Sequence, residues 1–580
     1  MSARAGLRRG HVLCSLTRRG SGIGRVGVSS AQQQQRRLLN HFISRAPPLP
    51  ETPPHNGVPD EPLSQPQAKS FTLAVKDNIA TTTSSLPTTC GSAFLASHHS
   101  PFEATIVTQL RRRGGVLVGK TNLDEFGMGS HSVNSAFGPV AQKAKRSAGG
   151  SSGGSAVAVA EGEADVALGT DTGGSVRLPA AYTGTVGYKP SYGMLSRHGV
   201  VPYANSLDTV GLLARSVGAV AELVVGAGRL WAEHDPMDPT SLSAAARARC
   251  ASVREGYQGG LPLPRDESSQ SQSPSLGERY TQRHGSSTLA RSHEAEKSPE
   301  AMVKGVRFGI PLEYNIEELD PCIRDAWAAA AERLRALGAR IVPVSLPSTR
   351  HALSAYYVIA PAEASSNLAK YDGVRYGSVR ADSDEDDSKT TTDAADGGVL
   401  YAATRGHGFG EEVKRRILLG SYTLSSEAMD NYFLQAQKVR RLVRRDFDRV
   451  FALENPLHEP EAFSLSDLPD TVAMENKFGP TEVDFLLCPT APTLAPLLEN
   501  VMAQRSPVDA YMNDVFTVPA SLAGLPAISI PMEVAAEKEE GVSAVAGLQL
   551  IGQFWDDARL LAVAGAVSDI LKAVPTVEGR

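Results

Sequence analysis

Two short segments rich in glycine and serine constrain this chain more than any other part of its sequence. Residues 148–155 read AGGSSGGS and residues 169–177 read GTDTGGSVR. Runs of this composition are most often flexible linkers, and that alternative stays open on composition alone. The flanks argue against it, because Ala156–Ala160 can pack as a helix and Asp165–Leu168 is a short apolar run. We therefore expect both segments to lie inside a folded domain.

From Phe71 onward the hydrophobic pattern predicts an α/β protein. Apolar runs such as Thr72–Val75 and Val116–Val118 predict strands, and Ala104–Arg113 is patterned as a helix. Residues 322–337 (CIRDAWAAAAERLRAL) predict an amphipathic helix that ends at Gly338. Residues 51–580 are expected to form one large domain.

Three polar segments interrupt this domain and are predicted to be disordered inserts. The composition shifts to Ser, Gln, Arg, Glu and Gly at about residues 251–300, residues 381–398 are acidic, and residues 454–480 are rich in Pro, Glu and Asp. Such segments cannot bury enough apolar surface to order themselves. Charge runs of this kind are usually solvated, so we assign them no chemistry.

The first 50 residues have the composition of an organellar transit peptide. They contain no acidic residue and nine arginines, namely Arg4, Arg8, Arg9, Arg18, Arg19, Arg25, Arg36, Arg37 and Arg45. They also lack the long apolar core of a secretory signal. We interpret residues 1–50 as a mitochondrial presequence that directs the protein to the matrix. A disordered basic tail is the alternative.

The overall composition argues against several other classes of protein. The net charge is −5 and the isoelectric point is about 6.3, so the chain lacks the overall positive charge that is typical of nucleic-acid-binding proteins. Any contact with RNA must therefore be local or shared with a partner. The five cysteines form no C-x-x-C pair, which argues against a disulfide framework and a zinc site. No apolar run reaches about 18 residues, so no membrane association is expected.

One motif suggests nucleotide binding, but its context is wrong. Residues 114–121 read GGVLVGKT and satisfy the P-loop pattern G-x-x-x-x-G-K-[ST]. A phosphate loop needs a strand before its first glycine, whereas here Val116–Val118 inside the motif is itself the predicted strand. We expect a structural strand and no ATP site.

The second glycine and serine segment has the chemistry of an acyl-transfer site. A glycine backbone can approach a substrate carbonyl without a Cβ clash and direct its N–H groups at one point. The N–H groups of Thr172, Gly173 and Gly174 are therefore candidates for an oxyanion hole. Ser175 follows them and is the candidate nucleophile.

A serine hydroxyl is a weak nucleophile and needs a base. No histidine lies in either segment, and the nearest one after Ser175 is His198, in a loop-like stretch. Lys76 ends an apolar run and can serve as base if burial makes it neutral. A surface lysine after an edge strand is the alternative for a lone residue of this kind.

Four motifs resemble the amidase signature family: VKDNI at 75–79, GGSSGGS at 149–155, DTGGSVRLPAA at 171–181 and GYKPSYG at 187–193. The resemblance implies a three-layer α/β/α fold with a mixed sheet between helices. It also implies a Ser–cis-Ser–Lys triad, with Ser175 as the nucleophile that forms the acyl ester, Ser151 as the bridging serine and Lys76 as the base. Ser152 and Ser155 would support the loop.

Three later segments, 363–377, 408–425 and 511–531, resemble the glutamine-dependent tRNA amidotransferases of that family. This resemblance implies a glutaminase subunit that releases ammonia from glutamine. A second, partner subunit would use ATP and Mg²⁺ to convert glutamyl-tRNA(Gln) to glutaminyl-tRNA(Gln) in mitochondrial translation. A third, small subunit would complete a heterotrimer, and tRNA would be contacted mainly through the partner subunits. This chain would bind no cofactor or metal of its own.

Free glutamine carries an α-carboxylate and an α-ammonium group, so its pocket needs a fixed cation and a fixed anion. By the same resemblance Arg416 and Asp514 supply them, and Tyr356 contacts the amino-acid part. Each charged residue also has a structural alternative to substrate binding: Arg416 can be an exposed residue on a basic helix, and Asp514 can be a helix N-cap.

Two other functions stay open on the sequence. A free-standing amidase of small amides would keep Ser175, Ser151 and Lys76 but would need neither the glutamine ion pair nor partners. A non-catalytic scaffold subunit would need none of these residues, and the intact triad speaks against it.

Overall fold

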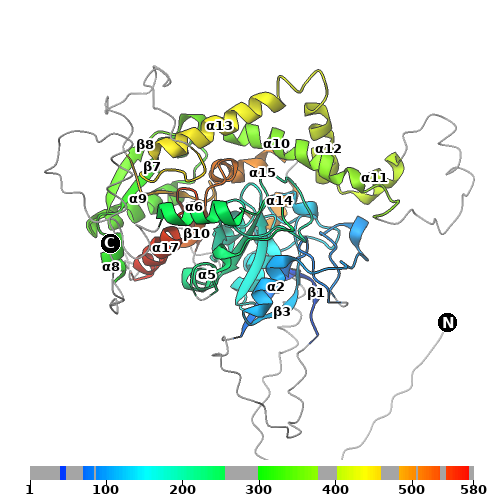
Figure 1. Cartoon of the computed structure of the whole chain (residues 1–580), viewed down its shortest axis with the longest axis horizontal. Helices are drawn as coiled ribbons and strands as arrows, with labels where there is room; N and C mark the ends of the chain where they lie inside the picture. The colour runs from blue at the N-terminus through cyan, green and yellow to red at the C-terminus, as the bar shows by residue number, and fades with distance from the viewer. Residues whose placement is uncertain are drawn as a thin grey trace, which may run out of the picture. The chain divides into compact units, whose positions relative to one another are not determined.

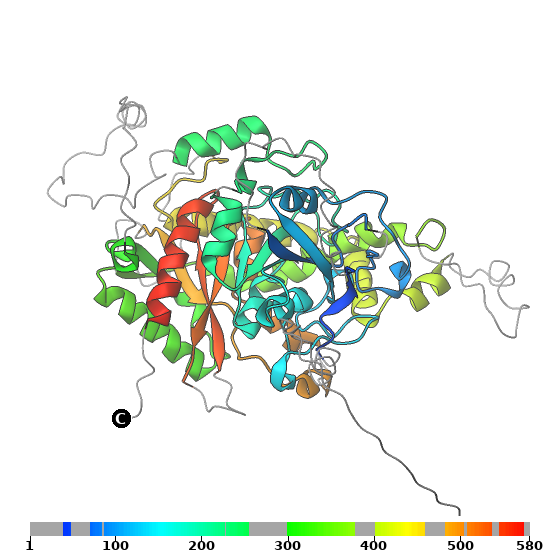
Figure 2. The same cartoon turned by 90° about the horizontal axis from the view of Figure 1, so that it is seen from below.

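The fold is built on one mixed sheet of eleven strands in the order β1-β3-β2-β4-β6-β5-β10-β11-β9-β7-β8 (Figures 1 and 2). The computed structural model describes residues 39–47, 70–83, 86–226, 228–254, 298–376, 401–458, 482–503, 507–535 and 544–573. The strands are β1 Phe42–Arg45, β2 Phe71–Lys76, β3 Gly115–Thr121, β4 Val166–Asp171, β5 Val186–Lys189, β6 Thr209–Ala214, β7 Arg307–Pro311, β8 Arg340–Val344, β9 Phe485–Pro489, β10 Ala527–Glu533 and β11 Val545–Ile551. β2 runs parallel to β3 and β4, and β7 runs parallel to β8 and β9, whereas the other pairs are antiparallel.

Helices cover both faces of this sheet. They are α2 Thr105–Arg112, α3 Gly153–Ala160, α4 Arg177–Thr183, α5 Val217–Val224, α6 Ala244–Arg254, α8 Pro299–Val303, α9 Pro321–Ala336, α10 Ala352–Asn367, α11 Ala402–Gly408, α12 Glu411–Thr423, α13 Phe433–Val450, α14 Leu498–Ala503, α15 Pro507–Tyr511, α16 Val518–Leu522 and α17 Asp557–Lys572. In Figure 2 the sheet lies between helices on its two sides. The predicted three-layer α/β/α architecture is confirmed.

The two faces of the central strands belong to two separate apolar cores. Along β4, Ala167 packs with the α3 and α4 side chains, whereas Val166 and Leu168 join the large core that also contains α5 and α17. Successive side chains of a strand point to opposite faces, so a strand covered on both faces is apolar throughout. Every residue of β4 and of β6 is buried.

The first glycine and serine segment is part of this packed structure. All residues from Ala148 to Ser155 are buried, and α3 begins at Gly153 inside the segment. The linker alternative is therefore wrong. The predicted strand at Val116–Val118 extends over β3, and its Lys120 forms a buried ion pair with Asp77 at 3.1 Å, so the P-loop pattern is a strand as expected.

Several predicted boundaries differ from those of the structure. The expected helix at 322–337 is α9, and Gly338 follows it with a φ of +93°. Phe42–Arg45, which we assigned to the presequence, forms the edge strand β1 against β3, because Arg45 pairs with Glu163 and Leu39 is buried. The last residues of the predicted presequence therefore form part of the sheet in this chain.

The predicted inserts fall mostly outside the described residues. Residues 251–254 complete α6 and residues 299–303 form α8, so the first insert is shorter at both ends than predicted. Residues 255–297, the whole of 381–398 and residues 459–480 lie outside the described part, as do residues 1–38 of the predicted presequence.

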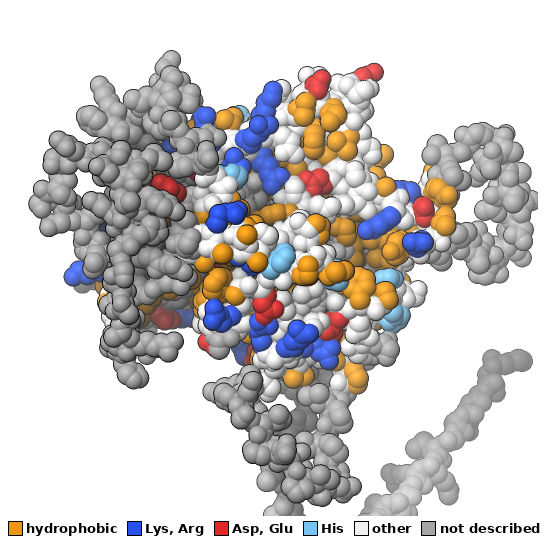
Figure 3. Space-filling view, in the orientation of Figure 1, with side chains coloured by type: hydrophobic (Ala, Val, Ile, Leu, Met, Phe, Trp, Pro, Cys, Tyr) orange, Lys and Arg blue, Asp and Glu red, His pale blue; other side chains and the backbone are white. Residues whose placement is uncertain are grey.

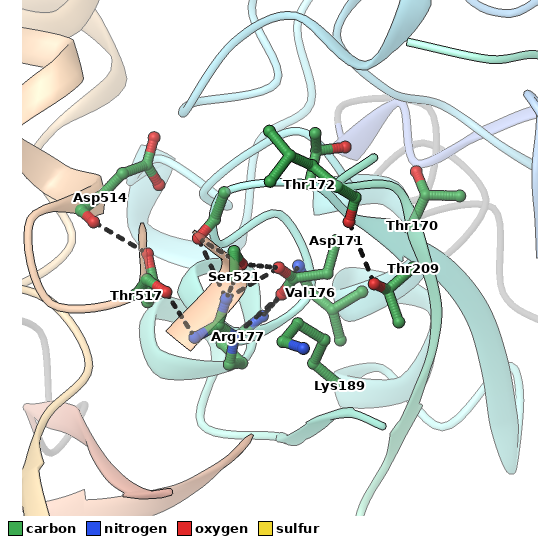
Figure 4. A network of polar contacts seen from close by, with 12 residues as sticks. Thr170, Asp171, Thr172, Val176, Arg177, Lys189, Thr209, Asp514, Thr517 and Ser521 are labelled. Carbon is green, nitrogen blue, oxygen red and sulfur yellow. Dashed lines mark hydrogen bonds and ion pairs between the residues drawn. The ribbon is translucent and has the colours of Figure 1, made fainter. Parts of the chain in front are cut away.

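A buried ion pair joins the end of β4 to the start of α4 (Figure 4). Arg177 and Asp171 are both fully buried, and the guanidinium donates to both carboxylate oxygens, at 3.0 Å from Nε and 2.8 Å from Nη2. Burial by itself raises the pKa of Asp171, but the Arg177 charge outweighs it and holds that pKa below its ordinary value.

Arg177 also binds the C-terminal part of the chain. Its Nη1 donates to the Thr517 carbonyl at 2.9 Å and to Gln549 Oε1 at 2.8 Å, and its Nη2 donates to Ser521 Oγ at 2.9 Å. A guanidinium offers five donors in a rigid plane, so a single side chain can fix several segments at once. The β4–α4 turn is thereby held against α16 and β11.

Replacing Arg177 by methionine is expected to destabilise the protein strongly. The substitution leaves Asp171 as an unpaired buried charge, which typically costs about 3–5 kcal/mol. Arg215→Met is the matched control, because the Arg215–Asp165 pair is about half exposed, at 54% and 47%, and exposed pairs contribute about 1 kcal/mol or less. Unfolding in urea measures both losses, and equal losses would contradict the role assigned to Arg177.

Candidate active site

Lys76 ends β2 inside the protein and contacts Ser151. Its Nζ lies 2.8 Å from Ser151 Oγ, 2.9 Å from Thr170 Oγ1 and 3.4 Å from the Thr170 carbonyl oxygen. The side chain is fully buried, so the alternative of a surface lysine is wrong. Burial lowers the pKa of Lys76 to about 7, against the opposing effect of nearby carboxylates, of which Asp124 is the strongest. A lysine with this pKa is substantially neutral near pH 7.

Ser151 lies on a tightly packed loop. The Gly150–Ser151 peptide bond is cis, the geometry that the family resemblance implied. A Cβ on Gly150 would overlap the Asp124 carboxylate and come within 2.5 Å of the His131 amide nitrogen, so glycine is needed for this close approach. The Ser151 carbonyl accepts the Asp124 N–H at 3.3 Å. The Asp124 backbone N–H therefore holds this loop, and the Asp124 side chain packs closely against Gly150.

Ser175 lies at the turn between β4 and α4. It is 9% exposed, whereas Ser151 is 1% exposed and Lys76 is fully buried, so exposure increases along the predicted triad. The Ser175 carbonyl accepts the Ser152 N–H at 3.1 Å, which ties the two glycine and serine segments together. Within the described ranges no hydrogen bond is formed by Ser175 Oγ, so the structure brings Lys76 and Ser151 into contact but does not join the two serine hydroxyls.

The predicted oxyanion-hole residues precede Ser175 in the same turn. The Gly173 carbonyl accepts from Arg177 Nη2 at 3.0 Å and from Ser521 Oγ at 3.2 Å. In a trans peptide the N–H points away from the C=O, so the Gly174 N–H faces away from Arg177. No described residue accepts from the N–H of Gly173 or Gly174. Thr172 is anchored by its side chain, which donates to Asp208 at 2.7 Å.

Two predicted substrate-binding residues pack directly against this turn. A Cβ on Gly173 would lie 2.8 Å from the ring of Tyr356, and a Cβ on Gly174 would lie 2.9 Å from Asp514 Oδ1. Tyr356 and Asp514 therefore lie beside the turn that carries Ser175, although they come from α10 and from the 3₁₀ helix Met512–Asp514.

Arg416 lies on α12 inside an aromatic cage. It is 3% exposed, so the alternative of an exposed residue on a basic helix is wrong. Its Nε donates to Glu412 at 2.7 Å and its Nη1 donates to the Tyr203 hydroxyl at 2.6 Å. The guanidinium also lies over the rings of Tyr357 and Tyr511, at 5.3 and 5.4 Å from their centroids. Cations are stabilised over such rings.

Asp514 is a buried carboxylate with two hydroxyl donors. Its Oδ2 accepts from Ser130 at 2.9 Å and from Tyr357 at 3.4 Å. The following helix, α16, has Thr517 at its N-cap, so the alternative of Asp514 as the N-cap is wrong. Burial raises the pKa of Asp514 to about 6, which the Ser130 hydrogen bond and the charge of Arg416 oppose. The group is charged at neutral pH.

The sequence did not point to several residues of this site. Asp124 is fully buried, burial raises its pKa to about 6, and its carboxylate accepts the N–H groups of Ser132 and Asn134. Glu412 and Tyr357 complete the surroundings of Arg416 and Asp514. Of these residues, only Tyr357 has a signal in the sequence. It directly follows Tyr356, which was predicted to bind the substrate, and neighbouring residues of a helix can reach two sides of a pocket. Nothing local in the sequence marks Asp124.

The described residues offer no cluster of ligating side chains that could hold a metal ion. Among the helices of the described ranges, none has the length and apolar character needed to cross a bilayer. The structure brings the Lys76 amine into contact with Ser151 and leaves the N–H groups of Gly173 and Gly174, next to Ser175, without a described acceptor. These are groups that acyl transfer by a serine uses.

The chain is similar to known proteins over nearly its whole length. The family model described as Amidase matches residues 70–261 and 277–561. A Podospora anserina protein, named as a mitochondrial glutamyl-tRNA(Gln) amidotransferase subunit, is 65% identical over 556 residues, which cover 95% of this chain and 99% of that protein. A Neurospora crassa protein of the same name is 61% identical and covers 94% of this chain and 97% of its own length.

A solved structure supports the same relationship. The corresponding glutamyl-tRNA(Gln) amidotransferase subunit from Thermotoga maritima aligns with a TM-score of 0.59 at 31% identity, covering 92% of this chain and 87% of that one. The names of the fungal relatives also confirm the predicted mitochondrial location. The chain belongs to the amidase family.

Proposed function

We propose that this chain is the glutaminase subunit of a mitochondrial glutamyl-tRNA(Gln) amidotransferase. The observation that carries the proposal is the buried contact between Lys76 Nζ and Ser151 Oγ, on a loop whose next residue, Ser152, donates its N–H to the Ser175 carbonyl. The relatives that are 65% and 61% identical are named as one subunit of that enzyme. The free-standing amidase and the non-catalytic scaffold have no observation that favours them.

Neutral Lys76 acts as the base through Ser151. A neutral amine has two N–H donors and one lone pair. Thr170 offers two acceptors to Nζ, its hydroxyl and its carbonyl, which leaves the lone pair facing Ser151 Oγ. Ser151 then passes its proton to Lys76 while it takes the proton of Ser175, so the nucleophile is activated without a histidine.

Ser175 attacks the side-chain carboxamide carbon of glutamine. The carbonyl oxygen becomes an oxyanion that the Gly173 and Gly174 N–H groups bind, because neither donor has another described partner. The proton held by Lys76 returns through Ser151 to the amide nitrogen, which leaves as ammonia. Water then attacks the acyl ester on Ser175, with proton transfer along the same path, and glutamate is released.

Arg416 and Asp514 recognise the two charges of glutamine. Arg416 keeps its charge inside the protein with Glu412 as partner, and it binds the α-carboxylate. Asp514 binds the α-ammonium group beside Gly174, and Tyr356 packs against the chain of the substrate next to Gly173. This arrangement orients the carboxamide toward Ser175.

The ammonia is used by a partner. We propose a heterotrimer with a second subunit, which uses ATP and Mg²⁺ on glutamyl-tRNA(Gln), and a third, small one. The formal charge of −5 on this chain supports a division of labour in which the partners hold most of the tRNA. This chain needs no cofactor of its own for amide hydrolysis.

Ser175→Ala in the assembled complex is expected to abolish glutamine-dependent formation of glutaminyl-tRNA(Gln). Added ammonium should still support amidation, because the partner reaction does not use Ser175. The measurement is the yield of glutaminyl-tRNA(Gln) with each nitrogen donor, and Ser97→Ala, at an exposed serine outside the triad, is the control. Retention of glutamine-dependent amidation by Ser175→Ala would rule out the nucleophile, and loss of both activities would point to a role in assembly.

Asp514→Asn is expected to raise KM for glutamine by about 10- to 100-fold, because a charge-assisted hydrogen bond contributes about 1.5–3 kcal/mol. Asparagine keeps the shape of the side chain, so folding should be little affected. Hydrolysis of a small uncharged amide should be unchanged, since it has no α-ammonium group. Steady-state ammonia release measures both, and an equal loss with both substrates would argue against recognition of the ammonium by Asp514.

A further inference from the structure

A cavity of about 470 Å³ lies between α13 and the end of α16, and Ser175 is not among its lining residues. Figure 3 shows Lys and Arg side chains gathered on the upper part of this face, over the helix that Figure 1 labels α13. The polar and aromatic residues that line the cavity are Tyr192, Thr240, Gln437, Arg440, Arg441, Arg444, Asn455, His458 and Phe554. A cavity of this size suits a small molecule.

The three arginines of the cavity differ in how they are held. Arg440 is fixed in the wall, since its guanidinium donates to the Leu522 carbonyl at 2.9 Å and to Ser206 at 2.7 and 2.8 Å. Arg444 is half-buried: its Nη1 lies 3.1 Å from His458 Nε2, its buried Nε faces Asp448 at 3.9 Å, and its Nη2 has no partner among the described residues. Arg441 is exposed and has no described ion-pair partner. Donors on Arg441 and Arg444 are therefore available to a ligand.

The charge of the cavity is positive. None of its described lining residues is acidic. Two carboxylates lie behind the arginines: Asp448, 3.9 Å from Arg444, and Glu363, whose charge acts on Arg440. The three arginines and these two carboxylates together carry a net charge of +1, without any charge on His458. An anion that enters the cavity is attracted to it.

We propose that this cavity binds a phosphate group carried by a small molecule. Guanidinium groups bind phosphate oxygens through paired N–H donors, and Arg441 and Arg444 lie one helical turn apart on α13. The rings of Tyr192 and Phe554 line the same cavity and offer an apolar surface to the rest of the ligand. Inorganic phosphate and a nucleotide monophosphate share the recognised group, so either is a suitable probe. The proposal does not depend on the proposed function of Ser175.

The cavity is also connected to the elements of the active site. Its floor includes Leu522, which accepts from Arg440, and the neighbouring Ser521 binds Arg177 and the Gly173 carbonyl. A ligand in the cavity thus lies one residue from the hydrogen bonds that hold the turn of Ser175.

Calorimetric titration of the full chain with inorganic phosphate and with AMP tests the proposal. We expect saturable binding at one site, weakened at least tenfold by Arg441→Ala and by Arg444→Gln and unchanged by Lys438→Ala, which removes a charge from α13 outside the cavity. Arg441 is exposed, so its substitution leaves the fold intact. Binding of phosphate alone identifies free phosphate as the source, and tighter binding of AMP identifies a nucleotide.

Two results would overturn the proposal. The first is the absence of saturable binding of either probe, or binding that Arg441→Ala and Lys438→Ala weaken equally, since that would reflect the general charge of α13. The second is a short single-stranded RNA that binds more tightly than AMP and depends on the same two arginines, because the surface would then serve a nucleic acid.

Discussion

The geometry around Ser175 depends on the buried ion pair between Asp171 and Arg177. The pair closes the turn between β4 and α4, and the remaining donors of Arg177 fix that turn to α16 and β11. Because the guanidinium also holds the Gly173 carbonyl, it determines where the next N–H group points. A buried charge pair is costly to desolvate, so this pair contributes more to the positioning of the turn than to net stability.

A second constraint is the burial of the groups that perform the chemistry. Lys76, Asp124 and Asp514 all lie inside the protein, and burial shifts each pKa toward the neutral form of its group. For Lys76 the neutral form is the useful one, because only a neutral amine accepts a proton from Ser151. The Asp124 carboxylate limits this shift of the Lys76 pKa, and the Asp124 backbone N–H holds the loop of Ser151, so one residue affects both the charge of the base and the position of the bridging serine.

The sequence predicted the architecture and the segments that carry chemistry, but not their assembly. Ser175 could be chosen from local features, since glycines precede it in a turn after an apolar run, whereas Ser151 and Lys76 acquired roles through family resemblance. The burial of Arg416 depends on Tyr203, Tyr357 and Tyr511, which come from three distant parts of the chain. No local pattern reveals such a cage, and the same reason explains why Asp124 was missed. Strand β1 was missed because composition cannot separate a basic tail from a basic edge strand.

The central claim is that neutral Lys76 is the base, and the pH dependence of kcat for glutamine hydrolysis at saturating substrate tests it most directly. The neutral fraction of Lys76 grows as the pH rises through its pKa of about 7. We therefore predict that kcat of the assembled complex rises about tenfold per pH unit below that value and levels off above it. A kcat that is flat across this range, or one that keeps rising toward the ordinary lysine pKa of 10.5, would contradict the account.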